Sequence, residues 1–417
     1  MLLKTILNRL HKHKSFVYGT ARWITHGGAE AIGVPVEPRA NGRPICSGCG
    51  RAGPGYDHLA ERRYQFVPMW GLAVFLLYAP RRVACPGCGV KVERLPWARG
   101  KSRLTTMYMW FLAAWAKRLS WQEVAEVFDT SWNSVYRSVT LAVLWGMANR
   151  VLDGIKAIGI DEIQWQKGHH YLTLVYQIDQ GCKRLLYIGQ ERTQASLRGF
   201  FEMLGEKRSQ ALQFIASDMW KPYLNVIAEK AGQAVHVLDR FHIMAQMNKA
   251  IDEVRAGEVK RLKRDGHEPV LKHSRWCLLK RKENLTGKQT VKLAELMKYN
   301  LRTVRAYLQR EDFQRFWDYK LAACAGRFLT EWCGRVMRSR IKPMKRVAKM
   351  LRRHHDLILN WFRAKGTISS GVVEGLNYNA KLTMKKAYGY RTARGIKIAL
   401  YHRLAALPEP EFTHKFW

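Results

Sequence analysis

Two short cysteine motifs constrain the fold of this chain more than any other feature. The segments CSGCG (residues 46–50) and CPGCG (residues 85–89) each end in a glycine, which allows a tight turn that directs backbone amides at the sulfurs. Two such turns supply four thiolates, the ligand set of a closed tetrahedral Zn²⁺ site. One motif alone would suit a redox pair equally well. The two together predict one structural Zn²⁺ bound by Cys46, Cys49, Cys85 and Cys88.

The residues around these motifs are expected to form a zinc ribbon over residues 46–100. Strands are predicted at Arg63–Val67 and Val74–Tyr78, which would make a long hairpin between the two motifs. Basic residues on its flank suggest that the ribbon also touches DNA; they are Arg81, Arg82 and Arg94. The preceding residues 1–45 form a separate N-terminal segment, in which only a short helix at Leu2–Lys12 is predicted.

The charge of the chain indicates its partner. Its 417 residues include 71 basic and 33 acidic side chains, a formal charge of +38 that is spread from end to end. A folded body of this charge repels itself unless it meets a polyanion, so nucleic acid is the expected partner. On charge alone, a ribosome-associated or membrane-surface protein remains open. The longest apolar run, near Val67–Ala79, falls short of the roughly 20 residues of a membrane span, and Met1–Lys14 lacks the apolar core of a signal peptide. We therefore expect a cytoplasmic protein without a membrane partner, whose cysteines are reduced or bound to metal.

Residues 101–152 carry the pattern of a helix-turn-helix. Helices are predicted at Leu104–Lys117, after the capping box Ser120–Glu123, and at Trp132–Arg150. A three-residue turn between the second and third helices is typical of DNA-binding proteins. The face toward DNA would carry Asn133, Ser134 and Arg137. An ordinary helical hairpin between two domains remains open.

From residue 153 to 242 the pattern changes to strands that alternate with helices, which indicates a mixed sheet flanked by helices. Asp161 and Asp218 each follow a short apolar strand. Such aspartates often cap turns, but strand ends are also where α/β sheets bind ligands. The predicted elements are strands at Ile155–Ile163, Tyr171–Ile178, Arg184–Gly189, Gln213–Ala216 and Val235–Leu238, and a helix at Leu197–Leu204.

Residues 243–366 are predicted to be helical and rich in Lys, Arg and Trp. Tryptophans at helical spacing are more often core residues than base-stacking groups, whereas some basic faces, such as Lys342–Arg353, are expected to contact phosphate. In the last segment, residues 367–417, Ser369 or Ser370 would cap a helix that carries Glu374 in its first turn. Asn377 and Lys381 lie three and seven positions later, so this face would hold a metal ligand beside DNA-binding groups. Lys385 and Arg391 continue the basic surface.

Several motifs together resemble transposases of the ISL-three insertion-sequence family over nearly the whole length of the chain. They are the two cysteine motifs, GIDE (159–162), SDMWKPY (217–223), VLDRFHI (237–243) and SSGVVEGLNYNAKLTMKKAYGYR (369–391). The last motif is the most specific of them. Ser370 departs from it, because many family members have Asn before that glycine.

The resemblance implies a multi-domain α+β protein with a zinc ribbon, a helix-turn-helix and a ribonuclease-H-like mixed α/β core, with a large all-helical insertion before its last acidic residue. It implies the catalytic triad Asp161, Asp218 and Glu374, which would bind two Mg²⁺ or Mn²⁺ ions for phosphoryl transfer. Asp239 and His242 would support this site, while Glu162 would point to the other side of its strand.

The activity implied is strand cleavage at terminal inverted repeats of double-stranded DNA, followed by attack of the freed 3′-hydroxyl on target DNA. Synapsis of two DNA ends implies a homodimer or larger assembly, associated with the bacterial nucleoid. Two alternatives remain open: an inactive, transposase-derived DNA-binding regulator, and a related nuclease that cleaves without strand transfer.

Overall fold

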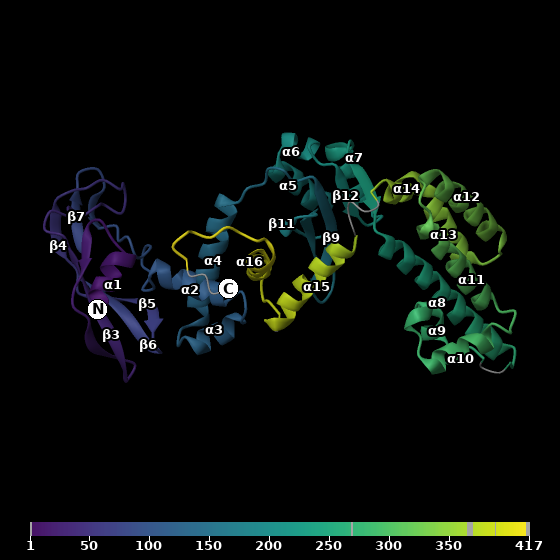
Figure 1. The fold of residues 1–417 in the computed structure, drawn as a ribbon, viewed down its shortest axis with the longest axis horizontal. Helices are drawn as coiled ribbons and strands as arrows, with labels where there is room; N and C mark the ends of the chain where they lie inside the picture. Colours follow the sequence, from purple (N-terminus) through teal and green to yellow (C-terminus); the bar gives the residue numbers. More distant parts are fainter. Residues whose placement is uncertain (1, 268–269, 365–369, 388, 414–417) are drawn as a thin grey trace. The chain divides into compact units, whose positions relative to one another are not determined.

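The structure is a computed structural model that describes residues 2–267, 270–364, 370–387 and 389–413 (Figure 1). The chain divides into two compact units, the first comprising Met1–Arg150 with Thr383–Trp417 and the second Val151–Leu382. The division falls within the helix α15 (Ser370–Lys386). The predicted segment 367–417 is therefore shared between the units, and most of its length belongs with the N-terminal residues.

The first unit begins with α1 (Leu3–Leu10) and a five-stranded sheet. Its strands are β1 (Phe16–Tyr18), β2 (Arg22–His26), β3 (Ala29–Pro38), β5 (Arg62–Met69) and β6 (Leu72–Tyr78). The order is β1-β3-β6-β5, with β2 paired to β3. Strands β3 and β6 are parallel, and all other pairs are antiparallel. Trp97 is 1% exposed and lies in the core of this sheet with Phe16, Tyr64 and Tyr78.

The predicted hairpin is present as β5–β6, but its pairing differs from the expectation. It joins the N-terminal strands through β3 and not a sheet that carries the cysteines. The cysteine motifs lie instead at a separate three-stranded antiparallel sheet of β4 (Gly55–His58), β7 (Arg81–Cys85) and β8 (Gly89–Val92). Within the predicted segment 46–100, the cysteines and the β5–β6 hairpin therefore belong to two different sheets.

The helical part of the first unit contains α2 (Thr106–Trp115), α3 (Trp121–Val127), α4 (Trp132–Asn149) and α16 (Ala393–Leu404). Helix α3 begins with the predicted capping box, in which Ser120 and Glu123 each accept a backbone amide of the other. Ile398 and Ala399 of α16 pack with Phe111, Val124 and Val139 of the other three helices. The C-terminal helix therefore completes the core of the predicted helix-turn-helix region.

The second unit is built on a five-stranded mixed sheet. Its strands are β9 (Ala157–Gln166), β10 (His170–Asp179), β11 (Cys182–Gln190), β12 (Phe214–Ser217) and β13 (Val235–Leu238), in the order β11-β10-β9-β12-β13. Strands β9 to β11 form an antiparallel meander, whereas β12 is parallel to both β9 and β13.

The two faces of this sheet are covered by different helices, because side chains alternate along each strand. Ile158 and Ile160 of β9 pack with residues of α5 (Gln194–Leu204) and α7 (Lys221–Ala231), and the short helix α6 (Glu206–Gln210) contacts both of these helices. Gly159, between them, faces Val373 of α15. Helix α15 therefore covers the opposite face.

The predicted all-helical insertion is present in the second unit, and its core is aromatic. Trp317 and Trp332 are buried there with Phe313 and Phe316, so the core interpretation holds for these two tryptophans, whereas Trp276 is 56% exposed. The α-helices are α8 (Arg240–Arg264), α9 (Arg275–Leu279), α10 (Gly287–Leu296), α11 (Arg302–Gln314), α12 (Ala322–Arg338), α13 (Lys342–Arg353) and α14 (His355–Arg363). Among the described residues, no helix combines the length and apolar character needed to cross a bilayer.

Candidate functional site

The four cysteines predicted to bind zinc come together. The Sγ atoms of Cys46, Cys49, Cys85 and Cys88 all lie within 4.8 Å of one another. A tetrahedral ion with Zn–S bonds of about 2.3 Å separates its sulfurs by about 3.8 Å, so the cluster has the size that zinc requires. The Sγ atoms of Cys49 and Cys85 are 3.5 Å apart.

Backbone geometry explains why each motif ends in glycine. Gly50 and Gly89 have φ angles of 72° and 71°, a left-handed conformation that other residues adopt only at a cost. The turns aim amides at the sulfurs: Gly48 N donates to Cys46 Sγ at 3.3 Å. Hydrogen bonds from the Gly87 amide and from Cys49 lower the pKa of Cys85 to about 7, whereas the hydrogen bonds of Cys49 and Cys85 raise the pKa of Cys88 to about 12.

A second constellation lies in the other unit, where three adjacent strands carry an aspartate: Asp161 lies within β9, which continues to Gln166 beyond the predicted end at Ile163, whereas Asp218 and Asp239 directly follow β12 and β13. Gly159 pairs with Ala216 across β9 and β12, and Asp161 and Asp218 each follow two residues later. On the next strand, Leu238 pairs with Ser217 and is followed by Asp239. The parallel register thus brings the three carboxylates to the same edge of the sheet.

Asp161 is held by α15. Its Oδ2 accepts a hydrogen bond from Asn377 Nδ2 at 2.5 Å, and its Oδ1 accepts one from the Glu162 amide at 2.8 Å. Asn377 in turn accepts a hydrogen bond from the hydroxyl of Tyr176 at 2.7 Å. Burial raises the pKa of Asp161, and Asp239 and Asp218 add to this effect.

The position of Asn377 corrects one expectation. We predicted a DNA contact, but its side chain is only 6% exposed and is engaged by both Asp161 and Tyr176. Glu374 and Lys381 of the predicted face are exposed, whereas Asn377 lies on the buried side of α15 with Val373 and Ala380. Asn377 is a residue that positions Asp161.

Arg192 connects Asp218 with Glu162. Its Nη2 lies 2.7 Å from Asp218 Oδ2 and its Nε 2.8 Å from Glu162 Oε1, while the guanidinium stacks on Trp220 at 4.6 Å. Burial and the neighbouring Asp218 raise the pKa of Glu162 to about 7. The other oxygen of Glu162 is buried without a hydrogen-bond partner among the described residues. Arg192 follows β11 in a loop, so no sequence pattern pointed to it.

Asp239 and His242 form a pair at the start of α8. Asp239 caps the helix by accepting the Phe241 amide at 2.8 Å, and its second oxygen lies 2.9 Å from His242 Nδ1. This hydrogen bond raises the pKa of His242 to about 9. Both residues act on the carboxyl group of Asp161: His242 lowers its pKa and Asp239 raises it.

Glu374, the third predicted acid, lies on α15 three residues before Asn377 and is exposed. Within the described parts of the chain, the four cysteines are the only group of three or more metal-ligating side chains with ligand atoms this close together. Asp161, Asp218 and Glu374 do not form so tight a cluster. Their oxygens are nevertheless the hard donors that Mg²⁺ and Mn²⁺ prefer, and Arg192 and His242 balance only part of the surrounding negative charge.

Among the predicted DNA contacts on the zinc ribbon, Arg81 is largely buried and paired with Glu93, Arg82 is paired with Asp57, and Arg94 is exposed. Five further predicted contacts are solvent-exposed. They are Asn133 and Arg137 on α4, Lys381 and Lys385 on α15, and Arg391 before α16. Ser134 is half-buried, and its amide and hydroxyl both contact Ser131, the N-cap of α4. Of the two predicted caps of α15, Ser369 lies outside the described residues, and the helix begins at Ser370.

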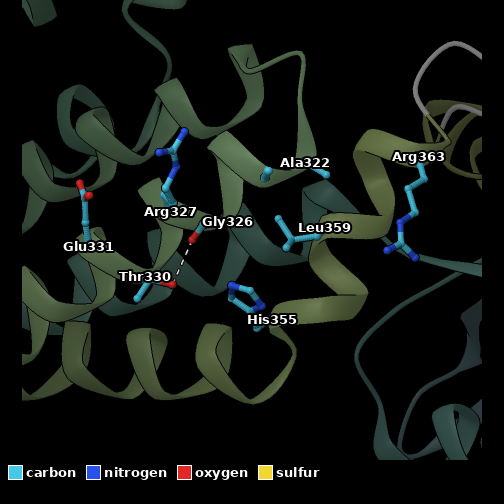
Figure 2. Close-up of a pocket in the computed structure, with 9 residues that line it drawn as sticks. Ala322, Gly326, Arg327, Thr330, Glu331, His355, Leu359 and Arg363 are labelled. Carbon is cyan, nitrogen blue, oxygen red and sulfur yellow. Dashed lines mark hydrogen bonds between the residues drawn. The ribbon is translucent and has the colours of Figure 1, made fainter.

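The helical insertion contains a groove of about 560 Å³ between α12 and α14. Figure 2 shows Arg327 and Glu331 along α12 and His355 and Leu359 from α14 at its side. The hydrogen bond drawn there runs from Thr330 to the carbonyl oxygen of Gly326, at 3.0 Å. Glu331 is the single carboxylate in the lining, so the groove lacks the donor set of a second metal site.

Comparison with known proteins adds to this geometry. A family profile of the ISL3 (ISL-three) group, described as transposase, matches residues 158–399. A second profile, described as the zinc-finger of transposase IS204/IS1001/IS1096/IS1165, matches residues 42–94. The first match spans Asp161, Asp218 and Glu374, and the second spans all four clustered cysteines.

Two named relatives are similar over most of their length. One is the transposase for insertion sequence element IS1001 of Bordetella parapertussis, 29% identical over 350 residues that cover 83% of this chain and 85% of the relative. The other is the transposase for insertion sequence element IS1557 of Mycobacterium tuberculosis, 29% identical over 390 residues that cover 87% of this chain and 86% of the relative. The same identity and coverage are found in two strains of that organism.

Proposed function

Because the chain belongs to the ISL3 family of transposases, we propose that it cleaves DNA at the terminal inverted repeats of an insertion sequence. It then joins the freed 3′-hydroxyl ends to target DNA. The proposed catalytic residues are Asp161, Asp218 and Glu374.

The observation that carries this proposal is the register of β9 and β12. Asp161 and Asp218 follow the paired residues Gly159 and Ala216 at the same distance along two parallel neighbours. The meander β9–β11 with β12 and β13 added in parallel supports a ribonuclease-H-like core. Asp161 lies on the central strand β9, and Asp218 follows the end of its parallel neighbour β12.

The residues around the acids support their proposed roles. Asn377 and the Glu162 amide orient the carboxylate of Asp161, and the Trp220 amide donates to Asp218 Oδ1 at 3.0 Å. Glu374 extends from the same helix as Asn377, so the docking of α15 that fixes Asp161 also fixes the backbone that carries the third acid. Asp161, Asp218 and Glu374 would hold Mg²⁺ or Mn²⁺, which would activate the attacking oxygen and stabilise the leaving 3′-oxygen.

The rest of the chain supports DNA binding. The zinc-binding sheet and the helices α3 and α4 are the proposed readers of the terminal repeats, with Asn133 and Arg137 on the exposed side of α4. Lys381, Lys385 and Arg391 are proposed to contact the DNA backbone, in agreement with the charge of +38. Bringing two DNA ends together would require a homodimer or a larger assembly.

The test is strand cleavage and joining with Mg²⁺ by the variants Asp161→Asn, Asp218→Asn and Glu374→Gln. Each substitution removes a negative oxygen ligand, so we expect activity to fall by more than about 100-fold while DNA binding is retained. Asp153→Asn is the matched control, because the side chain of Asp153 is 73% exposed in the same unit. Cleavage by Asp161→Asn at the wild-type rate would refute the assignment.

A transfer assay on pre-cut DNA ends separates the remaining possibilities. A transposase joins such ends to target DNA, a nuclease cleaves intact ends but does not join them, and a DNA-binding regulator does neither.

A further inference from the structure

The first unit contains a cavity of about 1170 Å³ that neither the zinc cluster nor the acidic residues use. It is formed by the start of α3, the first turns of α4 and the residues that lead from α15 into α16. Its size is sufficient for a ligand as large as a nucleotide. Its lining has two chemically distinct parts, one aromatic and one basic.

The aromatic part is built around Trp132, the first residue of α4. The Trp132 ring stacks on Tyr136 with a centroid distance of 5.4 Å and an interplanar angle of 7°. Trp121 lies 5.5 Å from Trp132 and 5.6 Å from Tyr390 of the C-terminal segment. Trp121 is buried and packs against Trp132 and Tyr390. Trp132 is 43% exposed and lines the cavity.

The basic part consists of Arg118, Lys385, Lys386 and Arg391. Lys386 Nζ donates to the carbonyl oxygen of Arg118 at 3.2 Å, which keeps this part of the rim together. Helix α16 also begins at the cavity with its N-cap Thr392, so the positive end of its dipole adds to the positive potential.

Two carboxylates line the same cavity, but both are engaged by their own helix. Glu123 Oε2 accepts the Ser120 amide at 2.6 Å in the capping box, and Glu126 Oε1 accepts a hydrogen bond from Gln122 at 2.8 Å. The positive charge of the four basic side chains and of the N-terminus of α16 therefore exceeds the negative charge of the two carboxylates. The charge of the cavity favours an anion.

We propose that this cavity binds an unpaired nucleotide of a DNA strand, with its base stacked on Trp132 and its phosphate near Lys385 and Arg391. Only an unpaired base exposes a face to which Trp132 can stack, because the bases of an intact duplex are covered by their neighbours. Stacking aromatics beside a basic groove is the chemistry of single-strand binding, and it tolerates any base. The inference rests on the proposed function only in taking DNA as the ligand.

The test compares the affinity of the full-length protein for two labelled DNA molecules, measured by fluorescence anisotropy without divalent cations. One is a fully paired duplex, and the other is the same duplex with a short unpaired extension. Trp132→Ala is expected to weaken binding of the extended DNA by roughly 5- to 150-fold, the value of one base–aromatic stack, and to leave the paired duplex unaffected. Lys385→Gln is expected to lower the salt dependence of binding to the extended DNA, by about 0.7 in the log–log slope.

Trp132→Phe and Trp276→Ala are the controls. Phenylalanine retains a stacking face and should keep the affinity, while the quenching of Trp132 fluorescence by the extended DNA disappears. Trp276 is 56% exposed and lies outside this cavity, so Trp276→Ala should not change the difference in affinity between the two DNA molecules. Thermal unfolding of each variant shows whether truncation has disturbed α4.

Equal losses by Trp132→Ala on both DNA molecules would overturn the proposal and assign Trp132 to ordinary duplex contact. No loss on either molecule would overturn it as well. Because no cleavage is measured, these outcomes are independent of the catalytic test with Asp161→Asn. A chain that binds the unpaired extension through Trp132 but cleaves nothing would retain this inference and lose the proposed function.

Discussion

The cysteine cluster and the proposed acidic site are assembled in opposite ways. The four cysteines come from two five-residue motifs, and their sulfurs already lie within 4.8 Å of one another. The acids come from β9, β12 and α15, and two of the neighbouring carboxylates are held by Arg192. A motif that carries its own turn geometry therefore specifies a site locally, whereas the acids depend on the register of a whole sheet and on a helix far along the chain.

The largest effect on folding is expected when the four-cysteine cluster loses a ligand. Replacing Cys85 by serine should remove the single bound Zn²⁺ and unfold the β4–β7–β8 sheet, because binding to such sites contributes roughly 10 kcal/mol or more to folding. Metal analysis and limited proteolysis of protein purified without chelators measure both effects. Cys324→Ser is the control, since Cys324 lies outside the cluster. A wild-type protein without zinc, or a Cys85→Ser variant that keeps it, would show that this cluster is not a metal site.

A smaller effect is expected from a substitution where α15 packs most closely against β9. A Cβ on Gly159 would lie 2.3 Å from Val373 Cγ2, so Gly159→Ala must push α15 away from the sheet. We expect a loss of about 1–3 kcal/mol in unfolding free energy, which exceeds the gain of less than about 1 kcal/mol from a stiffer unfolded chain. Urea unfolding measures this loss.

Two variants test the cause of that loss. Gly159→Ala combined with Val373→Ala should recover most of the stability, because the second change removes the atoms that clash. Gly181→Ala, at a turn where a new Cβ meets nothing within 4 Å, should be neutral or slightly stabilising. If the double variant were no more stable than Gly159→Ala alone, close packing of α15 would not be the reason.

The smallest effect is a dependence on pH. It has opposite signs for the stability contributed by the Asp239–His242 pair and for zinc binding by the cysteine cluster. The folded pKa of His242, about 9, lies above its ordinary value of 6.5, so its ion pair with Asp239 stabilises the fold fully below pH 6.5 and is lost as the pH rises through 9. The stability difference between wild type and His242→Gln should therefore shrink in alkaline solution. It should be small, because 42% of the His242 side chain is exposed.

Zinc binding should respond in the other direction, since acid protonates the thiolates and releases the ion. Unfolding curves recorded across this pH range test the His242 effect. A difference between wild type and His242→Gln that does not change between pH 6.5 and pH 9 would contradict it.

The sequence was most informative where the physical signal is local. The cysteine motifs, the Ser120–Glu123 capping box and the existence of β9 and β12 are predicted, because turn, cap and strand patterns lie within a few residues. The end of β9 is not, since this strand continues past Asp161 to Gln166. Strand β3 was missed, and with it the N-terminal sheet. This strand contains Gly33, Pro35 and Pro38, residues that ordinarily argue against a strand.

Features that depend on tertiary contacts were predicted less well. Arg192 lies in a loop, and nothing in the adjacent residues indicates that it bridges Glu162 and Asp218. The burial of Asn377 is not evident from the sequence, because a helix with polar residues all around it shows little periodicity. Packing of α16 on α2 to α4 was likewise absent from the local pattern.

The hydrogen bond between Asn377 and Asp161 has a consequence for synthesis of the protein, because it joins positions 216 residues apart. A ribosome adding about 5–20 residues per second needs roughly 10–45 seconds to travel from one to the other. During that interval the sheet that carries Asp161 has no α15 to cover its second face. A nascent chain therefore lacks the third proposed acid and the amide that orients the first until nearly all of the protein has been made. Premature termination anywhere in the helical insertion would release a product that retains the zinc motifs but lacks the proposed catalytic residue Glu374.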